Sequence, residues 1–270
     1  MPIARVGDLD INYSEAGSGP PLVLLHGLGG SATDWEHQLP HFAQRYRVVV
    51  PDQRGFGQTP RGRGLPSVPR FSADLRGLLD HLGIERFHLI GHSMGGAVAL
   101  QFALEHPQRV QRLVIANSVP SFQPQSARHY LEFAYRWMVM GLLGPARLAR
   151  IGAHRMFPEP HQAAERARSI ARGSRNTRAA YLGALAALGR WSVISRLGEL
   201  QMPVLVVASE HDYFGHAETV KFAHALPRGR LQVVDGAHHG LPSEHPETFN
   251  AIVQKFLDAP APRRRHHGVT

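Results

Sequence analysis

Short runs of apolar residues recur along the chain and alternate with stretches of helical periodicity. Six runs are rich in Val, Leu and Ile at consecutive positions: Pro21 to Leu25, Tyr46 to Val50, Phe87 to Ile90, Arg112 to Ala116, Val204 to Ala208 and Leu231 to Val234. Consecutive apolar positions are typical of strands buried on both faces, as in a parallel sheet covered by helices. We therefore predict an α/β fold with a mostly parallel, doubly wound sheet.

Helical patterns fall between these runs. Ser72 is predicted to cap a helix that continues to His81 and stops at Gly83. A second helix is predicted from Met94 to His106 and a third from about Pro246 to Leu257. The apolar stripe of the first helix consists of Leu75, Leu78, Leu79 and Leu82. The strands and helices thus alternate as a doubly wound fold requires.

The alternation lapses between about Val119 and Leu200. The stretch from Tyr130 to Leu143 is dense in aromatic, Met and Leu residues, and the stretches Ala163 to Arg172 and Ala179 to Leu188 are Ala-rich and helical in pattern. We predict an α/β core formed by residues 1–118 and 201–260, a helical lid inserted at 119–200, and a disordered basic tail at 261–270.

Candidate chemistry is concentrated in two glycine-rich turns. Gly91-His92-Ser93-Met94-Gly95-Gly96 lies between a predicted strand and a predicted helix, and a serine in such a sharp turn needs small neighbours because its own backbone is strained. The other turn, His26-Gly27-Leu28-Gly29-Gly30, also follows a strand. Attack on a carbonyl needs backbone N–H groups that hold the developing negative charge. Ser93 is therefore the candidate nucleophile.

Five motifs, taken in order, resemble the landmarks of the α/β-hydrolase-fold serine hydrolases, among them carboxylesterases and enol-lactone hydrolases. They are His26-Gly27, Asp52-Gln53-Arg54-Gly55-Phe56-Gly57, Gly91 to Gly96, Glu210-His211-Asp212 and Gly236-Ala237-His238-His239. The resemblance covers nearly the whole chain. It implies an oxyanion hole built from the N–H groups of Leu28 and Met94.

The resemblance also implies the acid and the base of a Ser, Asp, His triad. Asp212, after the predicted sixth strand, takes the acid position, with Glu210 as its rival. In the family, the basic histidine precedes a glutamate by five residues. Counting back from Glu244 selects His239 over the adjacent His238. A further acid, Asp52, is assigned a structural role, bracing its loop with Arg54.

The distribution of charge along the chain indicates which classes of partner to expect. The formal net charge is +9, and residues 121–200 hold twelve Arg, no Lys and four Glu. Because the excess is confined to this segment and the tail, we interpret it as a solvated basic face, with an anionic ligand as the alternative. We expect no nucleic-acid partner and no membrane partner. The absence of cysteine and of an apolar N-terminal signal predicts a cytoplasmic protein.

The predicted function is hydrolysis of a carboxylic ester or lactone through an acyl-enzyme on Ser93, without cofactor or metal, by a monomer or homodimer. Seven large apolar residues of the predicted lid are expected to line a pocket over Ser93, which would suit an apolar or aromatic acyl group. The alternative is that these seven residues form the lid's own core. They are Tyr130, Phe133, Tyr135, Trp137, Met138, Met140 and Leu142. Carbon-carbon bond hydrolysis, cofactor-free perhydrolysis and a non-catalytic receptor remain open alternatives.

Overall fold

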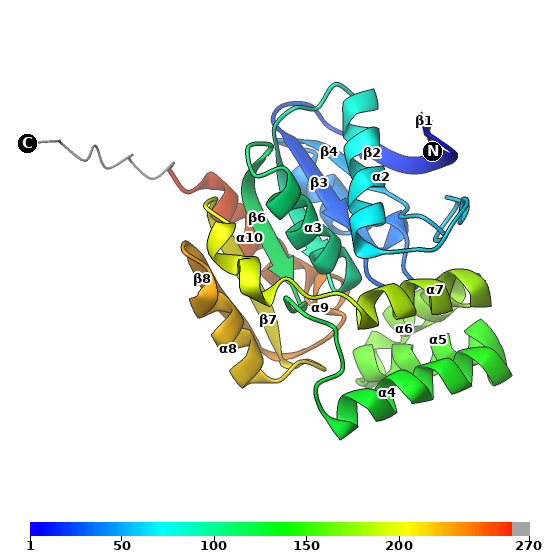
Figure 1. Cartoon of the computed structure of the whole chain (residues 1–270). Helices are drawn as coiled ribbons and strands as arrows, with labels where there is room; N and C mark the ends of the chain where they lie inside the picture. The colour runs from blue at the N-terminus through cyan, green and yellow to red at the C-terminus, as the bar shows by residue number, and fades with distance from the viewer. Residues whose placement is uncertain (261–270) are drawn as a thin grey trace, which may run out of the picture.

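The protein, described by a computed structural model over residues 1–260, is built on one eight-stranded sheet with strand order β1-β2-β4-β3-β5-β6-β7-β8 (Figure 1). The predicted disordered tail, 261–270, lies outside the described residues. The strands are β1 (Ile3–Val6), β2 (Leu9–Ala16), β3 (Pro21–Leu25), β4 (Arg47–Pro51), β5 (Phe87–His92), β6 (Val110–Ala116), β7 (Val204–His211) and β8 (Gly229–His238). From β4 to β8 every neighbouring pair is parallel. The predicted fold class is confirmed.

The first two strands, β1 and β2, were not predicted from the sequence. β1 and β2 pair antiparallel with each other, and β2 pairs antiparallel with β4. β2 reads Leu-Asp-Ile-Asn-Tyr-Ser-Glu-Ala and buries only part of its length. Edge strands with mixed polarity lack the continuous apolar run that identified the six central strands.

The long helices are α2 (Val68–His81), α3 (Met94–Glu105), α4 (Ala127–Met138), α5 (Gly144–Met156), α6 (Ala163–Gly173), α7 (Arg178–Gly189), α8 (His216–Ala225) and α10 (Pro246–Asp258). Short helices are η1 (Ala32–Trp35), α1 (Gln38–Phe42), η3 (Pro160–Gln162), η4 (Ile194–Glu199), α9 (Leu241–Glu244) and the π-helical turn η2 (Val139–Leu143). None of the helices within residues 1–260 combines the length and apolarity that crossing a bilayer requires.

The start predicted for α2 was wrong. The helix begins at Val68, and the cap is Ser67, whose hydroxyl accepts the N–H of Arg70 at 3.2 Å. Pro69 suits this first turn because its fixed φ is helical and its missing N–H would have no partner there. Ser72 lies inside the helix, fully buried, and its hydroxyl donates to Glu105 at the end of α3.

Apolar side chains from both faces of the sheet are fully buried. Along β3, Val23 and Leu25 join the cluster that contains α2 and α3, whereas Leu22 and Leu24 join the opposite cluster with Trp35 and helix α10. Helices thus cover both faces, which is why the central strands carry runs of consecutive apolar residues.

Between β6 and β7, residues 119–200 form α4, η2, α5, η3, α6, α7 and η4. We call these residues the helical segment. The helices predicted at 163–172 and 179–188 are confirmed as α6 and α7. Figure 1 shows α4 to α7 gathered together beyond one end of the sheet. These helices are distinct from the ones that cover the two faces of the sheet, and they lie opposite the loops at the carboxyl ends of the parallel strands.

Candidate active site

Ser93 occupies the turn between β5 and α3 and has φ 52° and ψ −117°. A positive φ is rare for a residue with a side chain and is kept only where the surroundings hold it. Here the Ser93 N–H donates to the carbonyl of Ala116 at 3.0 Å, and the Ser118 hydroxyl donates to the Ser93 carbonyl at 2.7 Å. Both partners belong to the end of β6 and the residues after it, so the neighbouring strand fixes the turn.

The glycines of the motif allow α3 to pack against the sheet at this turn. A Cβ on Gly95 would collide with the carbonyl oxygens of Leu25 and His26, and one on Gly91 would collide with the carbonyl of Gly95. Both collisions involve backbone atoms, which cannot rotate away. The need for small neighbours that the sequence predicted therefore has a physical cause in the close approach of α3 to β3 and β5.

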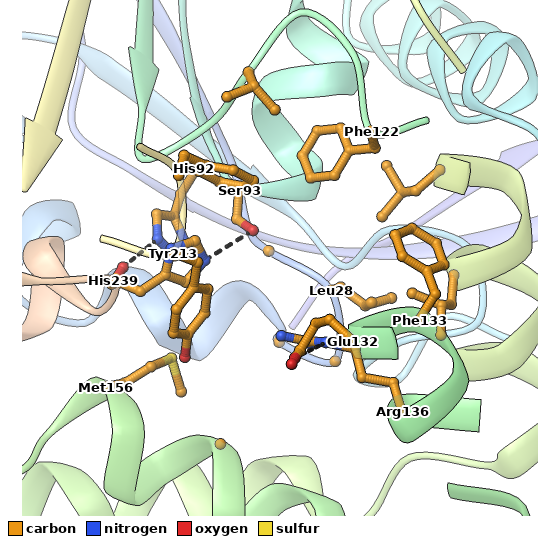
Figure 2. A pocket seen from close by; sticks show the side chains of 18 of the residues that line it. Leu28, His92, Ser93, Phe122, Glu132, Phe133, Arg136, Met156, Tyr213 and His239 are labelled. Atoms are coloured by element: carbon orange, nitrogen blue, oxygen red, sulfur yellow. Dashed lines mark hydrogen bonds and ion pairs between the residues drawn. The ribbon is translucent and has the colours of Figure 1, made fainter. Parts of the chain in front are cut away.

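The structure brings the three predicted triad residues together. His239 follows β8, and its Nε2 lies 3.0 Å from the Ser93 Oγ (Figure 2). The Nδ1 of the same ring lies 2.6 Å from Asp212 Oδ1. The carboxylate accepts at Nδ1, so that nitrogen carries the proton and Nε2 is left as the acceptor for the serine hydroxyl. The His239 and Asp212 side chains are 7% and 4% exposed. The arrangement can transfer a proton away from Ser93.

Several neighbours that the sequence did not single out hold His239. Its backbone carbonyl accepts from Asn117 Nδ2 at 3.1 Å and from His92 Nε2 at 2.8 Å. The ring of Tyr213 stacks on the His239 ring with centroids 4.3 Å apart. Burial lowers the pKa of His92 to about 3 and raises the pKa of Tyr213 to about 12. Both groups are therefore neutral near pH 7.

A sequence signal existed for each of these neighbours. Asn117 directly follows β6, His92 directly precedes Ser93, and Tyr213 directly follows Asp212. Residues at the carboxyl ends of parallel strands meet at one edge of the sheet, so position alone marks them as candidates. Their contacts depend on side-chain directions, which the pattern does not contain.

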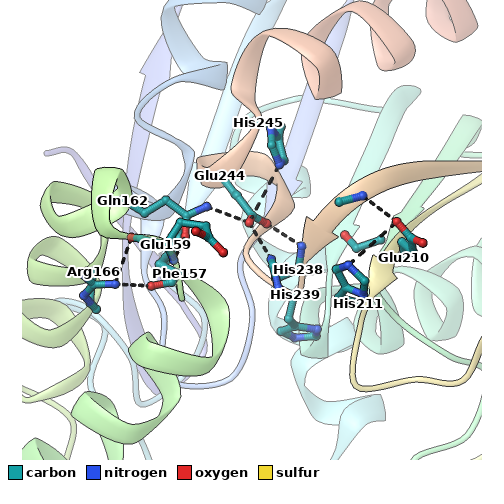
Figure 3. Close-up of polar contacts among 12 residues, drawn as sticks. Phe157, Glu159, Gln162, Arg166, Glu210, His211, His238, His239, Glu244 and His245 are labelled. Atoms are coloured by element: carbon teal, nitrogen blue, oxygen red, sulfur yellow. Dashed lines mark hydrogen bonds and ion pairs between the residues drawn. The ribbon is translucent and has the colours of Figure 1, made fainter.

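The rival residues point elsewhere, as Figure 3 shows. His238 Nδ1 lies 2.8 Å from the Glu244 carboxylate, and the same carboxylate accepts the His238 backbone N–H at 2.6 Å. Glu210 is about half exposed and accepts the N–H of Gly236 at 2.8 Å. Neither His238 nor Glu210 makes a hydrogen bond to the Ser93–His239 pair among the contacts of residues 1–260. Glu244, only 1% exposed, also accepts from Gln162 of the helical segment at 2.9 Å.

Hydrogen bonds of His26 hold the loop that follows β3. His26 Nε2 accepts the N–H of Gln53, and His26 Nδ1 lies 2.8 Å from the Gly27 carbonyl. Leu28 lines the cavity described below, and within the described chain its N–H has no backbone acceptor. Met94 is the first residue of α3, where a helix leaves N–H groups free. Both predicted oxyanion donors thus flank the Ser93 turn with free N–H groups.

Asp52 has the structural role that was expected, but with different partners. Its carboxylate accepts the backbone N–H groups of Ala32 and Gln58 at 2.7 and 2.8 Å. The expected contact with Arg54 was wrong, because Arg54 forms a two-point ion pair with Asp74 at 2.6 Å. A carboxylate that stabilises a turn through main-chain donors leaves the nearby arginine free to pair with α2.

A cavity of about 660 Å³ lies over Ser93 and His239. The loops after β3, β5, β6, β7 and β8 line one side, and α4, α5, α6 and α7 of the helical segment line the other. Of the seven large apolar residues predicted to line it, Phe133, Tyr135 and Met140 do so. The other four are 45% to 75% exposed and face away from it: Tyr130, Trp137, Met138 and Leu142. For those four, neither the predicted lining nor the alternative of a lid core holds. α4 presents only one of its faces to the cavity, and Leu142 lies exposed in η2.

Groups that could hold a metal ion lie away from the serine. Among residues 1–260, the candidate set of three is Glu36, His37 and Glu165, whose ligand atoms lie within 4.8 Å of one another. None of the three lines the cavity. Arg168 forms ion pairs with both glutamates, so each of these carboxylates already has a cationic partner.

Comparison with known proteins agrees with this architecture. A family model described as the alpha/beta hydrolase fold matches residues 20–246. A protein of Stutzerimonas stutzeri that carries the name carbamate hydrolase RutD is 34% identical over 88% of this chain and 91% of its own. A hydrolase of Pseudomonas aeruginosa is 26% identical with a TM-score of 0.86, covering 96% of this chain and 98% of its own. An enol-lactonase from Burkholderia xenovorans has the same TM-score at 24% identity, over 95% and 99% of the two chains.

Proposed function

The chain belongs to the alpha/beta hydrolase fold family and is a hydrolase, and from that premise we propose that it cleaves carboxylic esters or lactones through an acyl-enzyme on Ser93. The observation that carries the proposal is the hydrogen-bonded sequence from Ser93 Oγ through His239 to Asp212, at the floor of a cavity. A hydroxyl, an imidazole and a buried carboxylate in this order form a nucleophile, its base and the group that orients the base.

The proposed reaction has two halves. In the first, Nε2 of His239 takes the Ser93 proton as Oγ attacks the carbonyl carbon, and the imidazolium then gives that proton to the leaving alkoxide. In the second, water loses a proton to His239, attacks the acyl-serine and releases the carboxylic acid. Asp212 stabilises the imidazolium in both halves. Ser93 is regenerated with its hydrogen, so the net change is addition of one water across the ester bond.

The N–H groups of Leu28 and Met94 are assigned to the oxyanion. Charge on the carbonyl oxygen peaks in the tetrahedral intermediate, and fixed donors there need no reorganisation when it forms. Removing one such donor typically costs about 10²- to 10³-fold in turnover. The support in this chain is the position of both residues beside the Ser93 turn with free N–H groups.

Residues 119–200 are proposed to act as a lid that selects the substrate. Phe122, Phe133 and Leu185 of this segment line the cavity together with Ser93. An apolar wall over the nucleophile suits the hydrocarbon part of an acyl group and keeps bulk water from the acyl-enzyme. The core residues, in contrast, contribute the chemistry.

A carbamate is the second candidate substrate class. The likeness to a protein named as a carbamate hydrolase, at 34% identity over most of both chains, favours it. A carbamate carbonyl can undergo the same attack by a serine, with the alkoxide or the amine as the leaving group.

The test compares Ser93→Ala with the unchanged protein on p-nitrophenyl esters of increasing acyl length, on lactones and on aryl carbamates. We expect a loss of turnover of roughly 10⁴-fold or more on the preferred class. The matched control is Ser195→Ala, because Ser195 is exposed in η4 and does not line the cavity. Retention of turnover in Ser93→Ala would overturn the proposal, and the preferred class decides between ester, lactone and carbamate.

A further inference from the structure

Two arginines and one glutamate of the helical segment form a charged cluster in the wall of the cavity. Glu132 and Arg136 lie one turn apart on α4, and Arg155 lies on α5. Arg136 Nε donates to Glu132 Oε1 at 2.8 Å, and Arg155 Nη1 contacts both Glu132 oxygens at 3.2 and 3.3 Å. All three residues line the cavity. One carboxylate is thus shared by two cations, which leaves an uncompensated positive charge.

The two guanidinium groups retain unused donors. A guanidinium has five N–H bonds. Within residues 1–260, Arg136 uses Nε for Glu132 and Nη1 for the Tyr181 hydroxyl at 3.2 Å, and Arg155 donates from Nη1 alone. The remaining N–H groups, including both Nη2 atoms, have no acceptor in the described chain. Donors on a cation that the protein leaves free are available to an anionic ligand.

Aromatic rings hold both guanidinium groups in place. Arg136 lies 5.8 Å from the Tyr213 ring centroid, and Arg155 lies 5.5 Å from that of Tyr135. Tyr213 in turn stacks on His239, so that Arg136 is linked to the reacting centre through one aromatic ring (Figure 2). The cluster is therefore beside the proposed triad, and its orientation is fixed before a ligand arrives.

The charges around the cavity also favour an anion. Four cationic side chains line it, Arg136, Arg155, Arg172 and Lys221, against the three acids Asp34, Glu132 and Glu218. Arg172 pairs with Asp34 at 2.6 Å and is balanced. The excess positive charge near Ser93 thus resides in the arginine cluster of α4 and α5.

We infer that Arg136 and Arg155 bind a second carboxylate of the substrate, one that takes no part in the reaction. The inference rests on the proposed ester or lactone hydrolysis. The planar guanidinium matches a carboxylate through two parallel N–H···O bonds, and Glu132 occupies only part of this capacity. The substrate class is the half-ester of a dicarboxylic acid, or a lactone that bears a carboxylate. Its hydrolysis consumes one water, and the bound carboxylate leaves unchanged.

The test measures kcat/KM for two matched substrates, p-nitrophenyl hydrogen adipate, which carries a free carboxylate, and p-nitrophenyl hexanoate, which is neutral. The quantity compared is the ratio of kcat/KM for the carboxylate substrate to kcat/KM for the neutral one. A second pair, 4-acetoxybenzoate and its methyl ester, places the carboxylate on the leaving group. We expect the unchanged protein to favour the carboxylate in at least one pair. Arg136→Met and Arg155→Met should each lower that ratio about 10-fold or more, since each removes a charge-assisted hydrogen bond. Glu132→Gln should raise it, because the competing carboxylate is lost.

The matched control is Arg128→Met, the same change on an exposed position of α4 outside the cavity lining. A ratio near one in both pairs for the unchanged protein, or an equal loss in Arg128→Met and Arg136→Met, would overturn the carboxylate site. If Arg136→Met does not fold, Arg155→Met and Glu132→Gln still decide. Hydrolysis of the hexanoate and acetate esters tests the proposed function separately, because these neutral substrates do not need the cluster.

Discussion

The sheet with its loops and the helical segment differ in how they build the cavity. On the sheet side, main-chain hydrogen bonds fix Ser93 and Asp212, and close-packed glycines surround the Ser93 turn. The main-chain carbonyl of His239 is held by the side chains of Asn117 and His92. On the other side, α4 buries none of its residues and contributes to the cavity through long side chains such as Arg136. From this difference we expect the reaction chemistry to depend on backbone geometry and the choice of substrate to depend on side chains that can be exchanged.

The largest expected effect concerns the sheet side. Asp212→Asn should lower kcat by about 10⁴-fold, because an amide cannot stabilise the imidazolium and favours the wrong tautomer of His239. Steady-state rates on a neutral p-nitrophenyl ester measure it. Glu210→Gln is the matched control, because Glu210 is half exposed and its carboxylate contacts the Gly236 N–H and the His211 side chain rather than His239. Similar rates for the two variants would show that Asp212 is not the orienting acid.

A pair of glycine substitutions contrasts the packing of the two regions. Gly95→Ala should reduce the free energy of unfolding by about 3 kcal/mol, because the new Cβ overlaps carbonyl oxygens of the loop after β3. Gly152→Ala in α5 should raise it by about 0.5 to 1 kcal/mol, since nothing lies within 4 Å of the added Cβ and alanine favours the helix. Urea unfolding measures both, and equal losses would contradict the contrast.

Acid sensitivity should arise in the sheet. Burial, with the charge of Arg112, lowers the pKa of His88 to about 4. Between pH 6.5 and pH 4 the unfolded chain protonates this histidine, whereas the folded protein keeps it neutral. The free energy of unfolding therefore falls as the pH falls from 6.5 toward 4. His88→Gln should recover about 2 kcal/mol of the loss between pH 7 and pH 5. Urea titrations at both pH values test this, and exposed His81→Gln should leave the loss unchanged.

The smallest effect on stability is expected at a contact between the helical segment and the loop after β8. Gln162 of η3 donates to the buried Glu244, which also holds His238. Gln162→Ala removes one donor from a carboxylate that keeps its other partners, so we expect a loss of about 1 kcal/mol in the free energy of unfolding. Gln123→Ala, which removes an exposed contact to Arg190 within the helical segment, is the control. If both variants lose the same free energy of unfolding, the contact between Gln162 and Glu244 adds no stability.

The two regions also differ in how far the sequence predicted them. Parallel strands that are buried on both faces are rich in apolar residues at consecutive positions, and a sharp turn needs glycine. β3, β5 and the Ser93 turn were therefore evident from residue types. The resemblance to a known family then implied Asp212 and His239, and the structure brings both to Ser93.

The helical segment was predictable only as helices. Whether Trp137 or Phe133 faces the cavity depends on the rotation of α4 against α7 and the sheet loops, which is set by tertiary packing. The pairing of Glu132 with both Arg136 and Arg155 joins two helices, so composition showed the Arg excess without its location. The same limit explains Ser72, where a buried contact to Glu105 competes with capping.

The nucleophile can be tested most directly by labelling the intact protein with a fluorophosphonate, followed by mass spectrometry of its peptides. We predict one adduct per chain, on Ser93, with labelling lost in Ser93→Ala and unaffected in Ser195→Ala. His239→Ala should slow labelling strongly, because the hydroxyl loses its base. An adduct on any other residue, or equal labelling of Ser93→Ala, would contradict the assignment of Ser93.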